Sequence, residues 1–191
     1  MKKILTIAGS DPSGGAGIQR DLAVFTELGC YGLSAVTAVT SQNTRGVKES
    51  YTVPAQTVKA QITTIFADLP PDAVKTGMLA SKENTEEVYK TLKKEKVGIL
   101  VVDPVIKSST GYALLEEDAL DAMRKLVDIA TISTPNVREA QVLSGVRIKS
   151  AEDMREAAEE IGDCVITGGD EDAKDLLYYE GEYAEFPGLK K

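Results

Sequence analysis

Histidine is absent from this chain of 191 residues, and its absence limits the chemistry that the chain can perform. Histidine is the side chain that most often acts as a general base near neutral pH, and it is also a common metal ligand. A Ser-His-Asp triad and a histidine-bound metal are therefore excluded. Acid–base catalysis would fall to aspartate, glutamate, lysine, tyrosine or cysteine.

Cysteine is scarce, and negative charge outweighs positive charge. Cys30 and Cys164 form no C-x-x-C pair, so the sequence supports neither a zinc site nor a dithiol redox motif. We interpret both as buried thiols of a cytosolic protein. The formal net charge of −8 argues against nucleic acid or an anionic membrane as the main partner. Small anionic substrates stay compatible with this charge, because a few backbone amides can hold a phosphate.

Long apolar runs are missing as well. The two lysines after Met1 precede an apolar run, as in a signal peptide, but Gly9-Ser10-Asp11 ends that run too early. No stretch is long and apolar enough to span a bilayer. The length and the hydrophobic share of 42% are ordinary for one globular domain. We therefore predict a single cytoplasmic domain over residues 1–191, without a membrane partner.

Short apolar runs alternate with helical patterns along the chain. The runs that predict strands lie at residues 4–8, 31–39, 48–53, 73–76, 98–102, 129–133 and 164–167. Apolar residues at helical spacing predict helices at 18–25, 54–69, 81–95, 119–127, 136–143 and 150–161. Near the C-terminus, Glu180-Gly181 separates the strand-like segments 175–179 and 182–186, as in a β-hairpin.

This alternation predicts an α/β fold in which helices cover both faces of a mostly parallel sheet. The hairpin predicts antiparallel strands at one edge of that sheet. Ligands of such folds bind beyond the carboxyl ends of the strands. The candidate loops are therefore those that follow Ala8, Val39, Thr76, Val102, Ser133 and Thr167.

The first candidate loop, residues 9–17, is rich in glycine and lies between a predicted strand and a predicted helix. Gly9 and Gly14 have the spacing of a P-loop, but Gly15-Ala16 stands where lysine and serine or threonine would follow, so this is not a Walker A motif. A glycine-rich loop before a helix lets a ligand approach the backbone closely. A tight turn between strand and helix would have a similar sequence.

Polar side chains follow several of the other strands. Gln42 and Asn43 carry amides that suit a polar heterocycle, although they also suit a turn. Asp103 directly follows a buried strand, where it could hold Mg²⁺, face a phosphate or simply begin a turn. Asp21, one helical turn after the glycine-rich loop, is either a ligand contact or a solvated carboxylate.

Two further loops have both a structural and a functional interpretation. Asn136 and Glu139 have the spacing of a helix capping box, as do Ser150 and Asp153. The first pair could also lie near Mg²⁺ and a transferring phosphate, and the two interpretations are compatible. The segment Thr167-Gly168-Gly169-Asp170 is either a turn or a source of backbone amides for nucleotide phosphates.

Together these segments resemble the hydroxymethylpyrimidine and phosphomethylpyrimidine kinases of thiamine biosynthesis, which belong to the ribokinase-like superfamily. The matching segments are LTIAGSDPSGGAGIQ at 5–19 with Asp21, SQNTRGV at 41–47, KTGML at 75–79, VDPV at 102–105 and TPN-x-x-E at 134–139. The resemblance covers essentially the whole chain. It implies a ribokinase-like three-layer α/β/α fold and the ATP- and Mg²⁺-dependent phosphorylation of 4-amino-5-hydroxymethyl-2-methylpyrimidine and its monophosphate.

The resemblance also implies roles for ten residues. The pyrimidine site would be lined by Gly9, Asp21, Gln42, Met78 and Val105. The nucleotide and its phosphates would be bound by Asp103, Asn136, Glu139, Thr167 and Gly168, with Asp103 and Glu139 as ligands of Mg²⁺.

The sequence departs from that family in two places. Thr167 stands where the family usually has lysine, which would weaken charge neutralisation at the phosphoryl group. Family members also continue into a Gly-Thr/Ser-Gly-Cys-type segment that supplies an anion hole and activates the substrate hydroxyl. This sequence has no such motif before Lys191, and Cys164 lies in a predicted strand. We therefore interpret the domain as truncated at its C-terminus, and no catalytic residue is identified.

Two alternative functions stay open. One is a pyridoxal or pyridoxine kinase, whose substrates also carry a hydroxymethyl group. The other is a truncated module that binds the pyrimidine without turnover. Since members of the family are often dimers, a homodimer is a further hypothesis.

Overall fold

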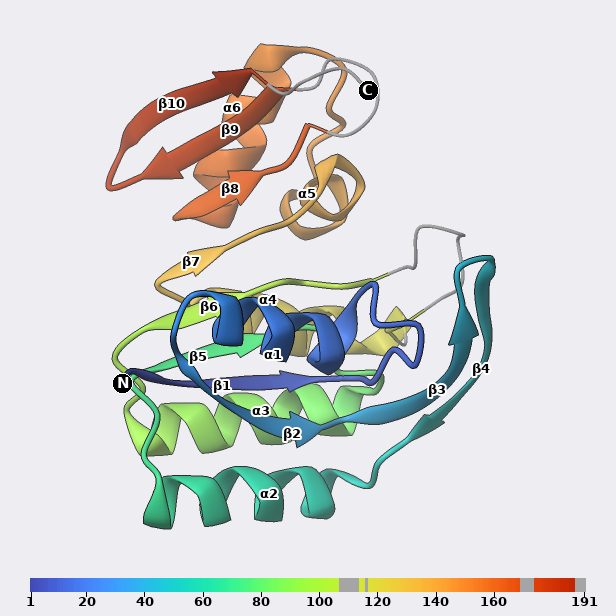
Figure 1. Ribbon diagram of the computed structural model, residues 1–191. Coiled ribbons are helices and arrows are strands. Elements are labelled where there is room, and N and C mark those ends of the chain that lie inside the picture. The colour runs from blue at the N-terminus through green and yellow to red at the C-terminus, as the bar shows by residue number, and fades with distance from the viewer. Residues whose placement is uncertain (107–113, 116, 169–173, 188–191) are drawn as a thin grey trace.

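The computed structural model describes residues 1–106, 114–115, 117–168 and 174–187. These residues form one eight-stranded sheet, in the order β10-β9-β8-β7-β6-β5-β1-β2, and a separate two-stranded sheet of β3 and β4 (Figure 1). The strands of the large sheet are β1 (Lys3–Ala8), β2 (Tyr31–Val36), β5 (Ala73–Thr76), β6 (Leu100–Val102), β7 (Ile132–Ser133), β8 (Cys164–Ile166), β9 (Lys174–Tyr179) and β10 (Glu182–Pro187). Those of the small sheet are β3 (Ala38–Asn43) and β4 (Gly46–Thr52).

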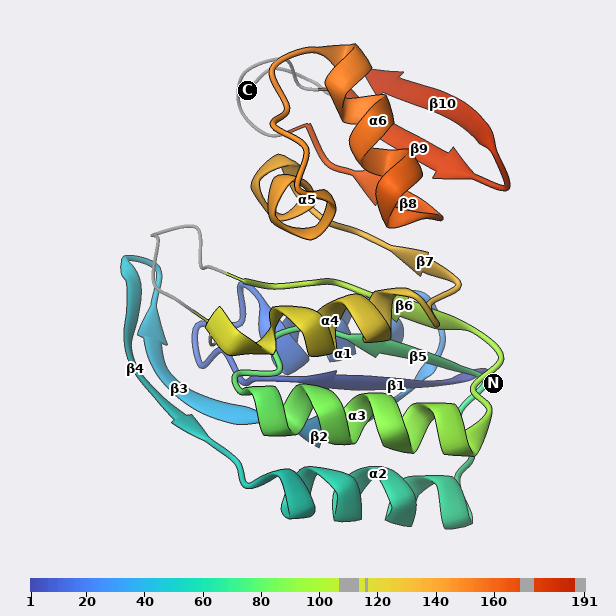
Figure 2. The same cartoon turned by 180° about the vertical axis from the view of Figure 1, so that it is seen from behind.

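Helices lie on both faces of the large sheet. They are α1 (Gly17–Glu27), α2 (Ala55–Asp68), α3 (Lys82–Glu95), α4 (Leu120–Val127), α5 (Val137–Ser144) and α6 (Ala151–Ile161), with a short 3₁₀ turn at Glu117–Ala119. Helix α1 covers one face, and α2, α3 and α4 cover the other (Figures 1 and 2). None of the described helices has the length and apolar character needed to cross a membrane.

The predicted fold class is confirmed. β1, β2 and β5 to β8 pair in parallel, whereas β9 pairs antiparallel with both β8 and β10. The predicted hairpin turn has positive φ at Glu180 (50°) and Gly181 (83°), the backbone of a tight turn that matches the twist of its strands. Helix α3 begins at the cap residue Ser81, as its sequence predicts.

The core follows from the pleat of the parallel strands. Alternate residues such as Leu5, Ile7, Val74 and Val102 point to the same face, where α2, α3 and α4 leave them at most 1% exposed. A second apolar cluster lies under α5 and α6 and includes Cys164. Burial raises the pKa of the Cys164 thiol to about 12, which suits a packing role. Cys30, which we interpreted as buried, is only partly so.

The prediction of one strand over 31–39 is wrong. The chain leaves the large sheet at Thr37, whose amide donates to the carbonyl of Ala8 and whose hydroxyl donates to the carbonyl of Met78, at 3.0 and 2.5 Å. From Ala38 onward the chain pairs with β4 instead. The apolar run is therefore not uniformly buried, and Val39 is 53% exposed.

The strand predicted over 129–133 is shorter than expected. The amide of Ala130 donates to the carbonyl of Val127 at 2.9 Å, so this part of the run extends the turn that ends α4. Only Ile132–Ser133 forms β7. Apolar side chains at the end of a buried helix and in a buried strand give the same local pattern.

Candidate active site

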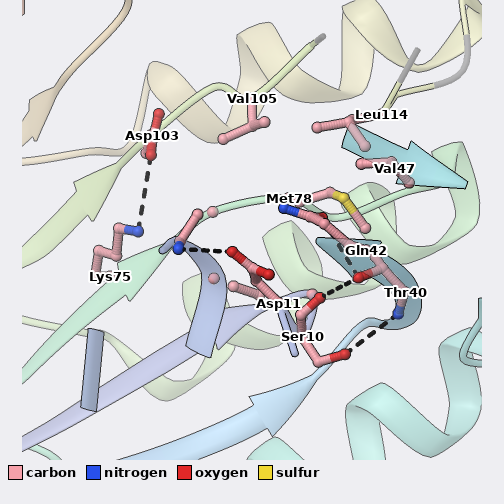
Figure 3. A pocket seen from close by; sticks show the side chains of 15 residues that line it. Ser10, Asp11, Thr40, Gln42, Val47, Lys75, Met78, Asp103, Val105 and Leu114 are labelled. Atoms are coloured by element: carbon pink, nitrogen blue, oxygen red, sulfur yellow. Dashed lines mark hydrogen bonds and ion pairs between the residues drawn. The ribbon is translucent and has the colours of Figure 1, made fainter. Parts of the chain in front are cut away.

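A cavity of about 300 Å³ opens at the carboxyl ends of β1, β5 and β6. Its walls come from the glycine-rich loop after β1, the β3–β4 hairpin, the segment after β5 and the segment after β6 (Figure 3). This is the edge of the sheet at which the rule for parallel α/β folds places ligands. The volume lies at the lower end of the range of about 300–1,000 Å³ that small-molecule pockets show.

Asp11 organises the glycine-rich loop from within. Its buried carboxylate accepts hydrogen bonds from the amide and hydroxyl of Ser13, at 2.8 and 2.7 Å, and from the amide of Ala16 at 2.8 Å. Burial by itself would raise the pKa of Asp11, but these hydrogen bonds outweigh it and lower the pKa. Sequence reasoning missed this residue, although an aspartate followed by serine and glycines is typical of such a turn.

Two glycines of this loop lie close to neighbouring atoms. A Cβ on Gly9 would lie 2.7 Å from the terminal methyl group of Met78, so that flexible side chain would have to shift within the cavity wall. Gly17 opens α1 with φ of 59°, and a Cβ there would lie 2.5 Å from the carbonyl oxygen of Gly9. The loop is therefore packed tightly against the residues that line the cavity.

The predicted pyrimidine-binding residues are only partly brought together. Gly9 belongs to the lining of the cavity. Gln42, Met78 and Val105 line it as well (Figure 3). Asp21 does not belong to its lining. Its carboxylate accepts a hydrogen bond from the hydroxyl of Thr6 at 2.6 Å and lies 3.0 and 3.1 Å from the ammonium group of Lys75.

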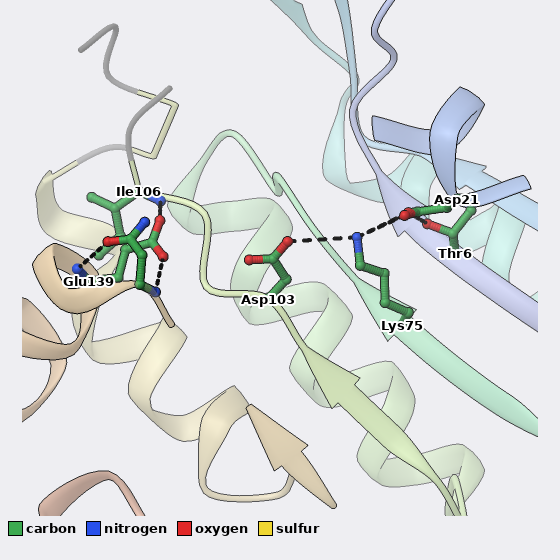
Figure 4. A network of polar contacts seen from close by, with 7 residues as sticks. Thr6, Asp21, Lys75, Asp103, Ile106 and Glu139 are labelled. Carbon is green, nitrogen blue, oxygen red and sulfur yellow. Dashed lines mark hydrogen bonds and ion pairs between the residues drawn. The ribbon is translucent and has the colours of Figure 1, made fainter. Parts of the chain in front are cut away.

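Lys75 is a second residue of the site that sequence reasoning missed. It lines the cavity, and its ammonium group lies between the carboxylates of Asp21 and Asp103, at 3.0 and 3.7 Å (Figure 4). The sequence contains an indication of this role, because Lys75 lies in the short strand 73–76 between Val74 and Thr76, which both face the core. A charged residue in such a position has to point to the other face of the sheet.

Asp103 lies where β6 ends, on the same edge of the cavity. Burial raises the pKa of its carboxyl; the positive charge of Lys75 opposes this rise, and the negative charge of Asp21 adds to it. Its side chain is still 33% exposed, so ligand atoms can reach it. Carboxyl groups with shifted pKa values beside a cavity are typical of functional sites.

Glu139 and Asn136 form the predicted capping box of α5. The side chain of each accepts a hydrogen bond from the backbone amide of the other at 3.0 Å. The second carboxylate oxygen of Glu139 accepts from the amide of Ile106 at 3.3 Å, which ties α5 to the segment after β6 (Figure 4). Burial raises the pKa of Glu139, and the nearby charge of Asp103 contributes to the rise.

Thr167 and Gly168 follow β8 at the same edge of the sheet. Thr167 pairs with Asn136 in an isolated parallel bridge, and its amide donates to the carbonyl of Pro135 at 3.0 Å. The amide of Gly168 donates to the carboxylate of Asp175 at 3.0 Å. A Cβ on Gly168 would overlap the backbone of Lys174, so only glycine fits. Gly169 and Asp170 lie outside the described residues.

Mg²⁺ fits the donors at this edge. Within the described parts of the chain, no three histidine, cysteine or acidic residues are close enough to hold a metal by themselves. Mg²⁺ usually keeps several waters and takes only one or two protein carboxylates together with substrate phosphates. Asp103 is accessible and Glu139 lies near it, which matches that ligand set.

Comparison with known proteins agrees with this arrangement. Residues 11–190 match the family described as phosphomethylpyrimidine kinase. The chain belongs to this family. Its relatives include the hydroxymethylpyrimidine/phosphomethylpyrimidine kinases of Aquifex aeolicus, 40% identical over 97% of this chain, and of Bacillus subtilis, 43% identical over 83% of it. The chain spans 76% of the Aquifex relative's length and 59% of the Bacillus relative's.

Solved structures of this kinase group have the same fold. Phosphomethylpyrimidine kinase from Clostridium difficile has a TM-score of 0.91 and 41% identity, and the match covers 98% of this chain and 85% of that one. Pyridoxal kinases are also similar. The Staphylococcus aureus enzyme in complex with pyridoxal has a TM-score of 0.86 and 35% identity, covering 97% and 70% of the two chains. The Bacillus subtilis enzyme in complex with ADP has a TM-score of 0.88 and 37% identity, covering 100% and 76%.

Proposed function

We propose that this domain binds hydroxymethylpyrimidine and its monophosphate and, in the protein to which it belongs, directs their phosphorylation by ATP. The observation that carries the proposal is the cavity at the ends of β1, β5 and β6. Four segments far apart in the sequence bring Gly9, Gln42, Met78 and Val105 to it. The names of two relatives, both hydroxymethylpyrimidine/phosphomethylpyrimidine kinases, support the same substrate.

The cavity suits a flat polar ring. Met78 and Val105 offer apolar contacts to the faces of the ring, and the amide of Gln42 can both donate and accept hydrogen bonds at its edge. Gly9 leaves the backbone open to close approach. We assign Asp21 an indirect role here, because its carboxylate contacts Lys75 and Thr6 and does not line the cavity.

Lys75 and Asp103 would act at the hydroxymethyl end of the substrate. Lys75 presents a fixed positive charge to the cavity and would neutralise negative charge that develops on the transferring phosphoryl group. It can thereby substitute for the lysine that Thr167 replaces in this sequence. Asp103, with Glu139 beside it, would hold Mg²⁺, which supplies charge neutralisation on the phosphate oxygens when it is bound.

The nucleotide would lie beyond β7 and β8. A similar pyridoxal kinase was solved in complex with ADP, which supports a nucleotide as the phosphoryl donor. Asn136, Thr167 and Gly168 lie at this edge and stay the predicted nucleotide contacts. The homodimer and the cytoplasmic location also stay predictions.

Pyridoxal is the second candidate substrate, because a pyridoxal kinase solved with pyridoxal covers 97% of this chain. The test is to measure phosphorylation of hydroxymethylpyrimidine, its monophosphate and pyridoxal side by side, with calorimetric binding of each. We expect the pyrimidines to be preferred in both measurements. A preference for pyridoxal would overturn the assignment, and pyrimidine binding without phosphate transfer would favour the binding module.

A further inference from the structure

Asn84 is a buried polar residue that lies outside the cavity but contacts several of the segments that form it. It belongs to the first turn of α3 and is 0% exposed. Its side-chain nitrogen lies within hydrogen-bond distance of three backbone carbonyls, those of Thr37, Val53 and Leu79, at 3.3, 3.2 and 3.1 Å. Since all three partners are acceptors, only the nitrogen of the amide can face them.

The three carbonyls belong to two segments that form walls of the cavity, namely the base of the β3–β4 hairpin and the segment after β5. Thr37 directly precedes β3 and Val53 directly follows β4, so these residues form the base of the hairpin. The amide of Val53 donates to the carbonyl of Thr37 at 2.8 Å and closes that base. Leu79 directly follows Met78, whose carbonyl accepts hydrogen bonds from Thr37 and Gly9.

These segments carry much of the proposed pyrimidine pocket. The β3–β4 hairpin brings Thr40, Gln42 and Val47 to the cavity, and the segment after β5 brings Met78. The hairpin forms a sheet of its own, and its residue Tyr51 is 69% exposed. Ser10 of the glycine-rich loop holds β3 through hydrogen bonds with Ala38 and Thr40. The position of the hairpin depends on these bonds and on how its base is held.

We propose that Asn84 is a positioning residue for the pyrimidine pocket, which fixes the base of the β3–β4 hairpin and the Met78 segment relative to each other. The proposal rests on the proposed function. An apolar side chain of similar size could fill the space of Asn84, but it would remove the two amide hydrogens that these three buried carbonyls share. The carbonyls of Thr37 and Leu79 would keep their bonds to the backbone amides of Val53 and Ser81. Relaxation of those carbonyls would displace Gln42 and Met78 together.

The test compares Asn84→Leu with a neighbour on the same helix. Thr85 is also 0% exposed, but its hydroxyl donates at 2.8 Å to the carbonyl of Ser81, at the start of the same helix. We expect Asn84→Leu to raise KM for hydroxymethylpyrimidine about tenfold or more while KM for ATP changes less than about twofold, since small displacements of binding groups are costly. Thr85→Val should change neither KM.

Hydrogen exchange gives a readout that does not depend on the substrate. Amides of residues 38–52 should exchange faster in Asn84→Leu than in the unmodified chain or in Thr85→Val, whereas those in the later turns of α3 should not. Asn84→Ser keeps a hydroxyl donor on a shorter side chain and should give a smaller effect of the same kind. This variant keeps the test possible if Asn84→Leu does not fold.

Unchanged hydrogen exchange of the hairpin, or equal rises in KM for both substrates, would overturn the proposal. Absence of pyrimidine phosphorylation in the unmodified protein would instead overturn the proposed function, and the exchange comparison would still decide the role of Asn84.

Discussion

The two halves of the candidate site are built in different ways. In the pyrimidine half, side chains such as Gln42 and Met78 line a cavity between loops that are far apart in the sequence. In the phosphate half, Asn136, Glu139 and Gly168 direct their polar groups at one another or at neighbouring backbone and side chains. Substitutions in the first half should therefore affect recognition, whereas those in the second half should affect stability as well as turnover.

Lys75 stands between the two halves, and its replacement should have the largest effect. Lys75→Met leaves the carboxylates of Asp21 and Asp103 without the cation between them and removes positive charge from the cavity. We expect kcat to fall about a hundredfold or more, as for the loss of other groups that stabilise charge in a transition state. Steady-state kinetics of the variant would measure this.

Lys90→Met is the matched control for that loss of charge. Lys90 forms an exposed ion pair with Glu86 on the surface of α3, and such pairs contribute little. The control should retain the kinetics of the unmodified protein. If Lys75→Met retained kcat within about threefold, a difference of well under 1 kcal/mol, Lys75 would have no part in charge stabilisation.

Gln42 tests the pyrimidine half by itself. Gln42→Leu keeps much of the volume but removes the amide from the cavity wall, so ring atoms of the substrate lose hydrogen-bond partners. We expect KM for the pyrimidine to rise about ten- to a hundredfold with a smaller change in kcat, because lost recognition acts on binding. The neighbouring Asn43→Ala serves as control, since the side chain of Asn43 accepts a hydrogen bond from Arg45 within the hairpin turn. Equal kinetics of both variants would remove Gln42 from the recognition site.

Glu139 tests whether the phosphate half is more than a helix cap. Glu139→Gln keeps one oxygen that can complete the capping box, as glutamine often does, while its amide nitrogen cannot accept the hydrogen bond from Ile106. If the charge acts on Mg²⁺ or phosphate, we expect kcat to fall about tenfold with little change in KM for the pyrimidine. Kinetics and thermal unfolding of the same variant separate the two roles.

The second capping box provides the control for Glu139. Asp153 accepts hydrogen bonds from the backbone at the start of α6, away from the cavity, and Asp153→Asn should lower thermal stability without changing kcat. A Glu139→Gln variant that behaves like Asp153→Asn would mean that Glu139 only caps its helix.

Local patterns in the sequence predict most of the fold and part of the site. Strand β5 and helix α3 begin and end where apolar spacing and a capping serine place them, and both capping boxes form as their spacing predicts. Gln42 and Met78 could be placed in the site because the resemblance to a kinase family identifies whole motifs. These features depend on residues that are close together in the chain.

The features that could not be predicted depend on contacts between distant segments. The chain turns out of the sheet at Thr37 because of hydrogen bonds to Ala8 and Met78. Asp21 meets Lys75 because β1 and β5 pair in a register that sets Thr6 beside Lys75. Asn84 looks like one more polar residue of a polar helix, and nothing near it in the sequence indicates its burial.

Asp11 offers the smallest effect and tests how the pyrimidine half is held in shape. Its pKa is lowered from an ordinary 3.8, so the ionised carboxylate stabilises the folded chain. That contribution is complete above pH 3.8, and it is lost as the pH falls through the lower pKa of the folded chain.

Asp11→Asn should reduce the free energy of unfolding by about 1–3 kcal/mol at pH 7, because hydrogen bonds to a charged acceptor are lost. The difference between variant and unmodified chain should shrink in strongly acidic buffer, measured by denaturant unfolding. Asp121→Asn, at a side chain that is 87% exposed, should show no such difference at either pH. A difference for Asp11→Asn that did not depend on pH would mean that shape, and not charge, holds the glycine-rich loop.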